Sequence, residues 1–446
     1  MKDPATMTAP LSLRSKLSYG LGDFGFGLSW NLIGAFLLLF YTDVALLPAA
    51  AAGTLLLASR LLDAGFDPVV GLMVDRTRSR WGRTRPYFLF GAIPFAILCV
   101  ATFWSPPVGE AGRIVWAAAS FVVVGLLFSL INIPYNALMP MMTLARDERL
   151  QLSGLRAAGT AASVIVATAA TMPLVSYFGG GSQARGFVIV IGIFAGITAL
   201  STLNLFFSCR EAVAEPDDNE APAVLPAIAL MFRNRTWLVV FAFAFLNFVR
   251  FGAVLAVTAF FAINVLRQPW MISILLPAVS GTLLIGAAIA PPYMRRLGIR
   301  RANLLALVVA LGLYVLLPFV EAAPKLFLAV YVSASIVLSL TMTAIFAMAA
   351  EAVDDHERLF GVRQEGLLSA GITLALKVGM ALGGAIIAYG LAAAAYDPRA
   401  VTEGARGMMR ILYYGPAYVT IVLQIVVNAF YRPGVSVRPA LDPQTA

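Results

Sequence analysis

Asp63 and Asp67 stand four residues apart in an otherwise mostly apolar segment. In a helix this spacing places both carboxylates on one face. Two carboxylates with hydroxyl or carbonyl oxygens nearby suit Na⁺, whereas a proton shared between them suits H⁺. We therefore expect a site for a monovalent cation, with Asp63 and Asp67 as the metal ligands if the ion is Na⁺. The alternative is that Arg60 pairs with one carboxylate and only holds helices together.

Three basic residues, Arg156, Arg250 and Lys377, also lie in apolar segments. A guanidinium is a planar fork that matches carboxylate, sulfonate or phosphate, and lysine is a mobile point charge. Facing a cavity, these charges favour an anionic ligand, although Arg250 is equally suited to pair locally. Four uncharged polar residues serve equally well as ligand hydrogen-bond partners or as contacts between helices: Asn31, Tyr135, Asn136 and Asn247.

The composition places these residues in a membrane. Of 446 residues, 60% are apolar and only 12% are charged, whereas a soluble protein carries about 25% charged residues. Runs of about 20 apolar residues, long enough to cross a bilayer, fill most of the chain. The net charge of +9 comes largely from basic clusters between these runs, which is typical of membrane topology rather than of nucleic-acid binding.

The apolar runs predict an all-α membrane protein with twelve spans, in two pseudo-symmetric six-helix halves. We expect the first half over residues 1–209, a cytoplasmic linker over 210–235 and the second half over 236–446. We expect the chain to lie in the inner membrane of a cell. The excess of Lys and Arg on one side of the expected spans favours both termini in the cytoplasm. The expected spans are Tyr19–Thr42, Ala49–Val74, Tyr87–Ser105, Ile114–Met139, Leu152–Phe178, Phe187–Ser208, Trp237–Val265, Met271–Tyr293, Asn303–Val320, Leu326–Ala350, Gly366–Tyr389 and Ile411–Tyr431.

Cysteine and histidine usage excludes several kinds of chemistry. The two cysteines and the single histidine, His356, form neither a disulfide framework nor a metal-binding spacing. We find no nucleophile–base pair and no cofactor motif, so we expect a protein that is not an enzyme and that needs only Na⁺ or H⁺. The glycines Gly20, Gly22 and Gly25 match a nucleotide-binding spacing, but no strand precedes them, so we expect close helix packing instead. Gly379 and Gly383 give the same expectation.

The two halves repeat corresponding features, which is the layout of the major facilitator fold. Four segments resemble the glycoside–pentoside–hexuronide:cation symporters: Leu17–Gly25, Tyr41–Val44, Arg60–Pro86 and Ile131–Pro140. A later segment, Glu351–Lys377, is similar to the C-terminal signature of that family. The resemblance implies alternating access around a solute site at the membrane midplane.

The resemblance also implies residue roles. It places Asp63 and Asp67 in a cation site together with Ser129 and Asn132, and it places Arg156 and Lys377 at the solute site. Three positions depart from the sugar-binding permeases of the family. Asn132 replaces an aspartate, Asn136 a tryptophan, and Gly27 the aspartate that grips sugar hydroxyls. Two carboxylates of the sugar site are therefore absent, while the basic residues Arg156 and Lys377 are present. This combination favours an anionic solute over a galactoside.

The loop after the second expected span carries the ordered charges of a gating motif in this superfamily, although membrane topology alone would also explain them. We expect gating from Asp75, Arg76, Arg78, Gly82 and Arg85, and further cytoplasmic locks from Asp147, Arg149, Glu351, Asp354 and Arg358.

Our leading hypothesis is a Na⁺- or H⁺-coupled symporter that imports a polar, anionic, glycoside-like solute. The second is a carrier of lysolipids or similar amphiphiles with the same fold, and the third is a non-transporting membrane sensor. We expect a small-molecule solute and membrane lipids as partners, no nucleic acid, and a monomer.

Overall fold

The computed structural model describes residues 11–143, 145–211, 224–362 and 364–432, and in these residues the regular structure is helical. Within them, eleven helices are long and apolar enough to cross a membrane. The helix Ala49–Arg76, with 28 residues, matches the remaining expected span and carries Asp63 and Asp67. The predicted all-α membrane class is therefore confirmed.

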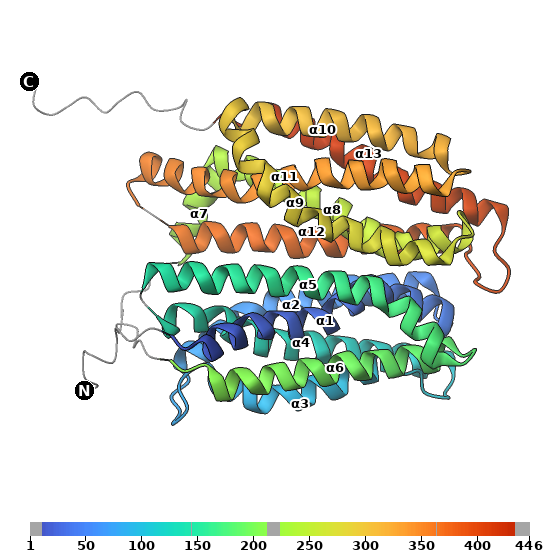
Figure 1. Cartoon of the computed structure of the whole chain (residues 1–446), viewed down its shortest axis with the longest axis horizontal. Helices are drawn as coiled ribbons and strands as arrows, with labels where there is room; N and C mark the ends of the chain where they lie inside the picture. Colours follow the sequence, from blue (N-terminus) through green and yellow to red (C-terminus); the bar gives the residue numbers. More distant parts are fainter. Residues whose placement is uncertain (1–10, 144, 212–223, 363, 433–446) are drawn as a thin grey trace, which may run out of the picture. The chain divides into compact units, whose positions relative to one another are not determined.

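The elements follow the chain in the order shown in Figure 1. They are α1 (Leu13–Leu39), the π-helix η2 (Phe40–Val44), α2 (Ala49–Arg76), α3 (Arg85–Thr102), α4 (Glu110–Met142), α5 (Arg146–Gly179), α6 (Gln183–Ser208), α7 (Val224–Arg233), α8 (Arg235–Asn264), the 3₁₀ turn η3 (Pro269–Met271), α9 (Ile272–Leu297), α10 (Ile299–Leu316), the 3₁₀ turn η4 (Leu317–Val320), α11 (Pro324–Phe360), α12 (Glu365–Ala393) and α13 (Glu403–Ala429).

The chain packs into two compact units. The first contains α1 to α6 together with Leu255–Gly281 and Gly384–Leu412, and the second contains α7, the rest of α8, Thr282–Gly383 and the chain from Tyr413 onward. The expected division into 1–209, 210–235 and 236–446 concerns sequence symmetry, and it stays a prediction. Of the expected linker, residues 212–223 lie outside the described residues.

In the first unit, α1 packs against α5 and α6, and small residues bring the backbones together. A Cβ atom on Gly159 would lie 2.3 Å from the carbonyl oxygen of Gly20, and one on Gly25 would lie 1.7 Å from Ser201 Oγ. These separations are far below van der Waals contact, so a side chain at either position displaces its neighbour. The glycines near the start of α1 are therefore a helix-packing feature, as predicted.

In the second unit, glycines on α12 give the same kind of contact with α8. A Cβ atom on Gly379 would lie 2.7 Å from the carbonyl oxygen of Phe245, and one on Gly383 would lie 2.2 Å from that of Val249. The Trp237 indole on α8 donates to the Leu368 carbonyl on α12 at 3.1 Å. The expected packing role of these glycines is confirmed.

Candidate functional site

The predicted carboxylate pair meets a serine from α4. Ser129 Oγ lies 2.6 Å from Asp63 Oδ1 and 2.7 Å from Asp67 Oδ1. Asp63 is only 3% exposed. A hydroxyl has one hydrogen and can donate to one acceptor at a time. The serine hydroxyl brings one oxygen of each carboxylate to the same point between α2 and α4.

The surroundings of the pair bear on the alternative that Arg60 only neutralises it. The Arg60 guanidinium lies over the Trp30 ring on α1, 4.4 Å from the ring centroid, and it also interacts electrostatically with Asp63. Arg60 therefore both balances charge and fixes α1 beside α2. Across the described residues, no group of three or more His, Cys, Asp or Glu side chains is placed to hold a metal ion.

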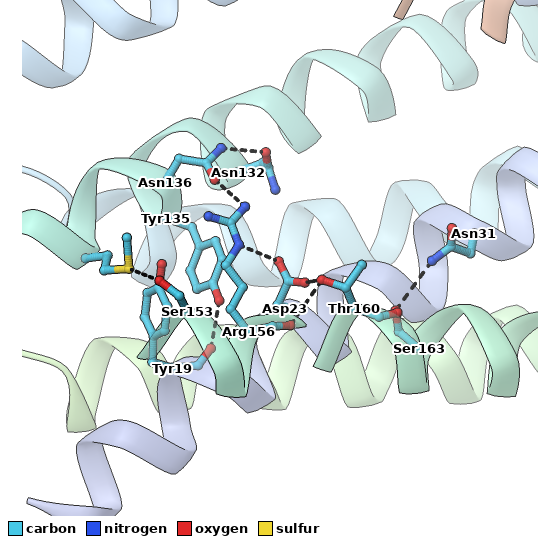
Figure 2. A network of polar contacts seen from close by, with 11 residues as sticks. Tyr19, Asp23, Asn31, Asn132, Tyr135, Asn136, Ser153, Arg156, Thr160 and Ser163 are labelled. Atoms are coloured by element: carbon cyan, nitrogen blue, oxygen red, sulfur yellow. Dashed lines mark hydrogen bonds and ion pairs between the residues drawn. The ribbon is translucent and has the colours of Figure 1, made fainter. Parts of the chain in front are cut away.

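A second polar cluster surrounds Arg156 on α5 (Figure 2). Arg156 Nε lies 3.5 Å from Asp23 Oδ1 on α1, and Arg156 Nη2 donates to Asn136 Oδ1 on α4 at 2.6 Å. Asn136 in turn donates to Asn132 Oδ1 at 3.1 Å. Thr160 donates its hydroxyl to the other oxygen of Asp23. The predicted residues Arg156, Asn136 and Asn132 therefore belong to one network, and it includes a carboxylate that the sequence analysis missed.

The position of Asp23 differs from what we expected for the charge around Arg156. We expected Arg156 and Lys377 to leave an excess of positive charge because the family's aspartates are replaced by Gly27 and Asn132. Instead, Asp23 provides a carboxylate one helical turn before Gly27. The i, i+4 spacing, which places both positions on one face of α1, was the signal that would have revealed it.

Of the two roles expected for Tyr135, its hydroxyl makes the contact between helices. Its hydroxyl donates to the Tyr19 carbonyl at 2.8 Å, and the side chain is fully buried. Its ring stacks on Tyr19 with centroids 4.7 Å apart and lies 5.2 Å from the Arg156 guanidinium. Tyr135 therefore supports Arg156 with its ring face, and its hydroxyl is occupied within the protein.

Asn31 lies on α1 beyond Gly27 and is half-buried. Its amide donates to the Gly27 carbonyl at 2.8 Å and to Ser163 Oγ on α5 at 3.5 Å. This side chain is largely engaged in the contact between α1 and α5.

The remaining predicted solute residues lie in the second unit. Arg250 is 8% exposed, donates to Asn247 Oδ1 and interacts with Tyr314. The Asn247 amide also contacts Met342 Sδ at 2.9 Å. These contacts favour local pairing over solute binding for Arg250 and Asn247. Lys377 is half-buried on α12, and its solute-binding role stays a prediction.

The predicted gating loop is anchored by a residue of the expected linker. Glu211 Oε2 accepts from the Arg83 N–H and Oε1 from the Thr84 N–H, both at 2.8 Å. Arg85 donates to the Phe206 carbonyl through Nε at 2.9 Å and through Nη2 at 2.6 Å. Gly82 has φ +106°, a conformation that only glycine adopts readily. Arg76 and Arg78 are exposed, and the Asp75 side chain lies outside the described residues.

At the start of α5, the acidic residue that makes the contacts is Glu148 rather than the predicted Asp147, which is exposed. Glu148 accepts from Thr143 Oγ1 at 2.8 Å and pairs with Lys16 Nζ at 3.2 Å. Arg149 donates to the Thr143 carbonyl at 2.9 Å. This cluster ties the start of α1 to the connection between α4 and α5.

The predicted lock residues on α11 lie in the turns that follow the expected span. Glu351 accepts from the Tyr431 hydroxyl. Asp355, which is 7% exposed, accepts from Thr236 Oγ1 at 2.8 Å and pairs with Arg358 at 3.6 Å. The predicted Asp354 is exposed. Asp355 lies on the buried side of α11, whereas Asp354 lies on its exposed side.

Comparison with known proteins assigns the family. Residues 18–432 match the model of the MFS/sugar transport protein family. The chain is 33% identical to the isoprimeverose transporter of Lactiplantibacillus pentosus, over 85% of this chain and 80% of that protein. It is 33% identical to the putative glycoside/cation symporter YagG of Escherichia coli, over 87% and 84%. It is 31% identical to the glucuronide carrier protein homolog of the same organism, over 87% and 86%.

The chain therefore belongs to the MFS/sugar transport protein family, and the resemblance found in its sequence is confirmed. It is a multi-pass membrane transporter and not an enzyme.

Proposed function

We propose that this transporter is a cation-coupled secondary symporter that imports a polar, glycoside-like solute across the inner membrane by alternating access, with both termini in the cytoplasm. Na⁺ and H⁺ both remain candidates for the coupling ion. Relatives named as an isoprimeverose transporter and as a glycoside/cation symporter support the solute class and the coupling.

One observation carries the proposal: α4 joins two polar clusters. Ser129 contacts the buried carboxylates of α2, while Asn132 and Asn136, one and two turns further along α4, contact each other and Arg156. The spacing of these three residues places them along one side of the helix. A movement of α4 caused by cation binding therefore acts directly on Arg156.

The charge of the solute has two candidates. The ion pair of Arg156 with Asp23 balances one of the two charges that favoured an anionic solute, and it supports an uncharged one. The relative named as a glucuronide carrier homologue keeps an acidic sugar as the second candidate.

The function is tested with the purified chain in proteoliposomes. We expect concentrative uptake of a glycoside when a Na⁺ or pH gradient is imposed, and only exchange when no gradient is present. A thermal-shift screen of neutral sugars, sugar acids and lysolipids, each with and without Na⁺, identifies the solute class. Stabilisation by lysolipids alone would contradict the glycoside proposal and favour the amphiphile carrier.

A further inference from the structure

Asp23 is the buried counterion of Arg156, and it was not among the residues expected at the site. The Asp23 side chain is 11% exposed and that of Arg156 is 33% exposed. Both Asp23 oxygens are engaged, one by Arg156 Nε and the other by Thr160. The carboxylate is therefore held in place from α5, and the guanidinium forms the more accessible side of the pair.

The packing of α1 against α5 explains why the carboxylate stands at position 23. A Cβ atom on Gly27 would lie 1.9 Å from Ser163 Oγ and 2.6 Å from its Cβ. An aspartate at position 27 would require α1 and α5 to separate. One turn earlier, the same face of α1 meets Thr160, whose hydroxyl donates to Asp23.

Side chains from α1 and α4 hold the guanidinium. Asp23 binds its Nε, Asn136 accepts from Nη2, and the Tyr135 ring lies beneath it. A guanidinium has five N–H donors, so this arrangement orients Arg156 and leaves donor capacity on its accessible side. Its charge, however, is already balanced within the protein.

A balanced ion pair and a lone guanidinium select different ligands. Hydroxyl groups can accept from Arg156 and donate to Asp23 while the pair stays intact. An anionic group close to Arg156 also lies close to Asp23, and like charges at this separation repel more strongly inside a protein than in water. An anion must therefore either bind against this repulsion or displace Asp23, which would leave a buried and unpaired carboxylate.

We propose that Asp23 is a specificity-determining residue that sets the charge preference of the solute site, so that the site around Arg156 takes the hydroxyl groups of an uncharged glycoside. This inference rests on the proposed glycoside transport function. Removal of the Asp23 charge converts the same guanidinium into an anion-binding group.

The test compares calorimetric affinities for phenyl β-glucoside and phenyl β-glucuronide, which differ only in the acidic group. We expect the wild-type chain to bind the neutral compound at least as tightly as the acid. Asp23→Asn should raise the acid-to-neutral affinity ratio by about tenfold or more, because the counterion of Arg156 is lost. Thr160→Val, which removes a hydrogen bond to Asp23 and leaves its charge, should keep the ratio within about twofold of wild type.

The double variant Asp23→Asn/Arg156→Gln keeps the test decisive if the single variant does not fold, since it leaves no unpaired buried charge. Its ratio should return to about the wild-type value. A wild-type preference for the acid, an unchanged ratio in a folded Asp23→Asn variant, or a double-variant ratio that departs from the wild-type value would overturn the role of Asp23. Failure of a well-folded wild-type chain to bind either compound would instead contradict the proposed glycoside function.

Discussion

Glu211 binds both hydrogen-bond donors of Thr84. Glu211 Oε1 accepts from the Thr84 N–H at 2.8 Å and from the Thr84 hydroxyl at 2.7 Å. Thr84 directly precedes α3, so its N–H is one of the groups at the start of a helix that lack an intrahelical partner. The carboxylate also lies where the partial positive charge of a helix N-terminus favours an anion. The end of α6 is thereby fastened to the loop that carries the predicted gating residues.

We expect Glu211→Ala to release this loop, and Cys209 provides a native reporter of the release. Cys209 is fully buried, and burial raises the pKa of its thiol to about 12. Little thiolate is therefore present near neutral pH in the folded protein. In a Cys99→Ser background, Glu211→Ala should increase the rate of alkylation by iodoacetamide by about tenfold or more, because thiolate is the reactive form. Glu110→Ala, which alters an exposed acid on α4, should leave the rate unchanged. Equal rates in both variants would show that Glu211 does not hold the loop.

The cation site gives a second prediction. Asp63→Asn or Asp67→Asn should abolish accumulation of solute driven by an ion gradient while the protein remains folded, since each removes a charged ligand. Ser129→Ala should weaken the affinity for the coupling ion by about tenfold through the loss of one oxygen. Ser120→Ala, another buried serine on α4, should have no effect on coupling. Uptake into proteoliposomes measures all four variants, and full concentrative uptake by both carboxamide variants would disprove the site.

The same variants identify the ion. Thermal stabilisation of the wild type by Na⁺ but not by K⁺, lost in Asp63→Asn, would establish sodium. Stabilisation that follows pH and ignores Na⁺ would establish protons.

The glycine contact between α1 and α5 predicts opposite outcomes at two positions five residues apart. Gly159→Ala places a methyl group against the Gly20 carbonyl, and we expect it to cost about 1–3 kcal/mol of unfolding free energy. A Cβ atom on Gly154 meets nothing within 4 Å, so Gly154→Ala should be neutral or slightly stabilising, as alanine is the better helix former. Denaturant titration of the far-ultraviolet circular dichroism compares them. A loss of stability that is equal in the two variants would rule out steric contact as the cause.

Asp43 and Tyr396 provide a fourth prediction. The Tyr396 hydroxyl donates to Asp43 Oδ2 at 2.9 Å, and burial together with the nearby Asp43 charge raises the pKa of Tyr396. The phenol therefore stays protonated, and keeps donating, at alkaline pH where an ordinary tyrosine ionises. Tyr396→Phe should lower the unfolding free energy by about 0.5–1.5 kcal/mol. Tyr389→Phe, which removes a more exposed hydrogen bond to Thr54, should cost less. The reverse order in thermal melts would contradict this assignment.

Local spacing predicted much of what the structure contains. The i, i+4 pair Asp63–Asp67, its partner Ser129, and the glycine contacts each follow from one helix or from a stated resemblance. Asp23 escaped notice because the resemblance directed attention to Gly27, and only the contact with Ser163 shows why the carboxylate is displaced. Glu211 escaped because an acidic segment rich in proline is typical of a solvated linker. Neither residue could be assigned without knowing which helix lies next to it.

The glycine contact between α1 and α5 also bears on how solute affinity can change during transport. Because α1 and α5 touch backbone to backbone at Gly20 and Gly159, we expect the two helices to move together and to carry Asp23 and Arg156 with them. An interaction that is the same in two conformations contributes equally to both and cannot shift the equilibrium between them. The Asp23–Arg156 pair would then contribute the same free energy to solute binding in both conformations. Any difference in affinity between the two access states must arise from groups that this rigid pair of helices does not carry.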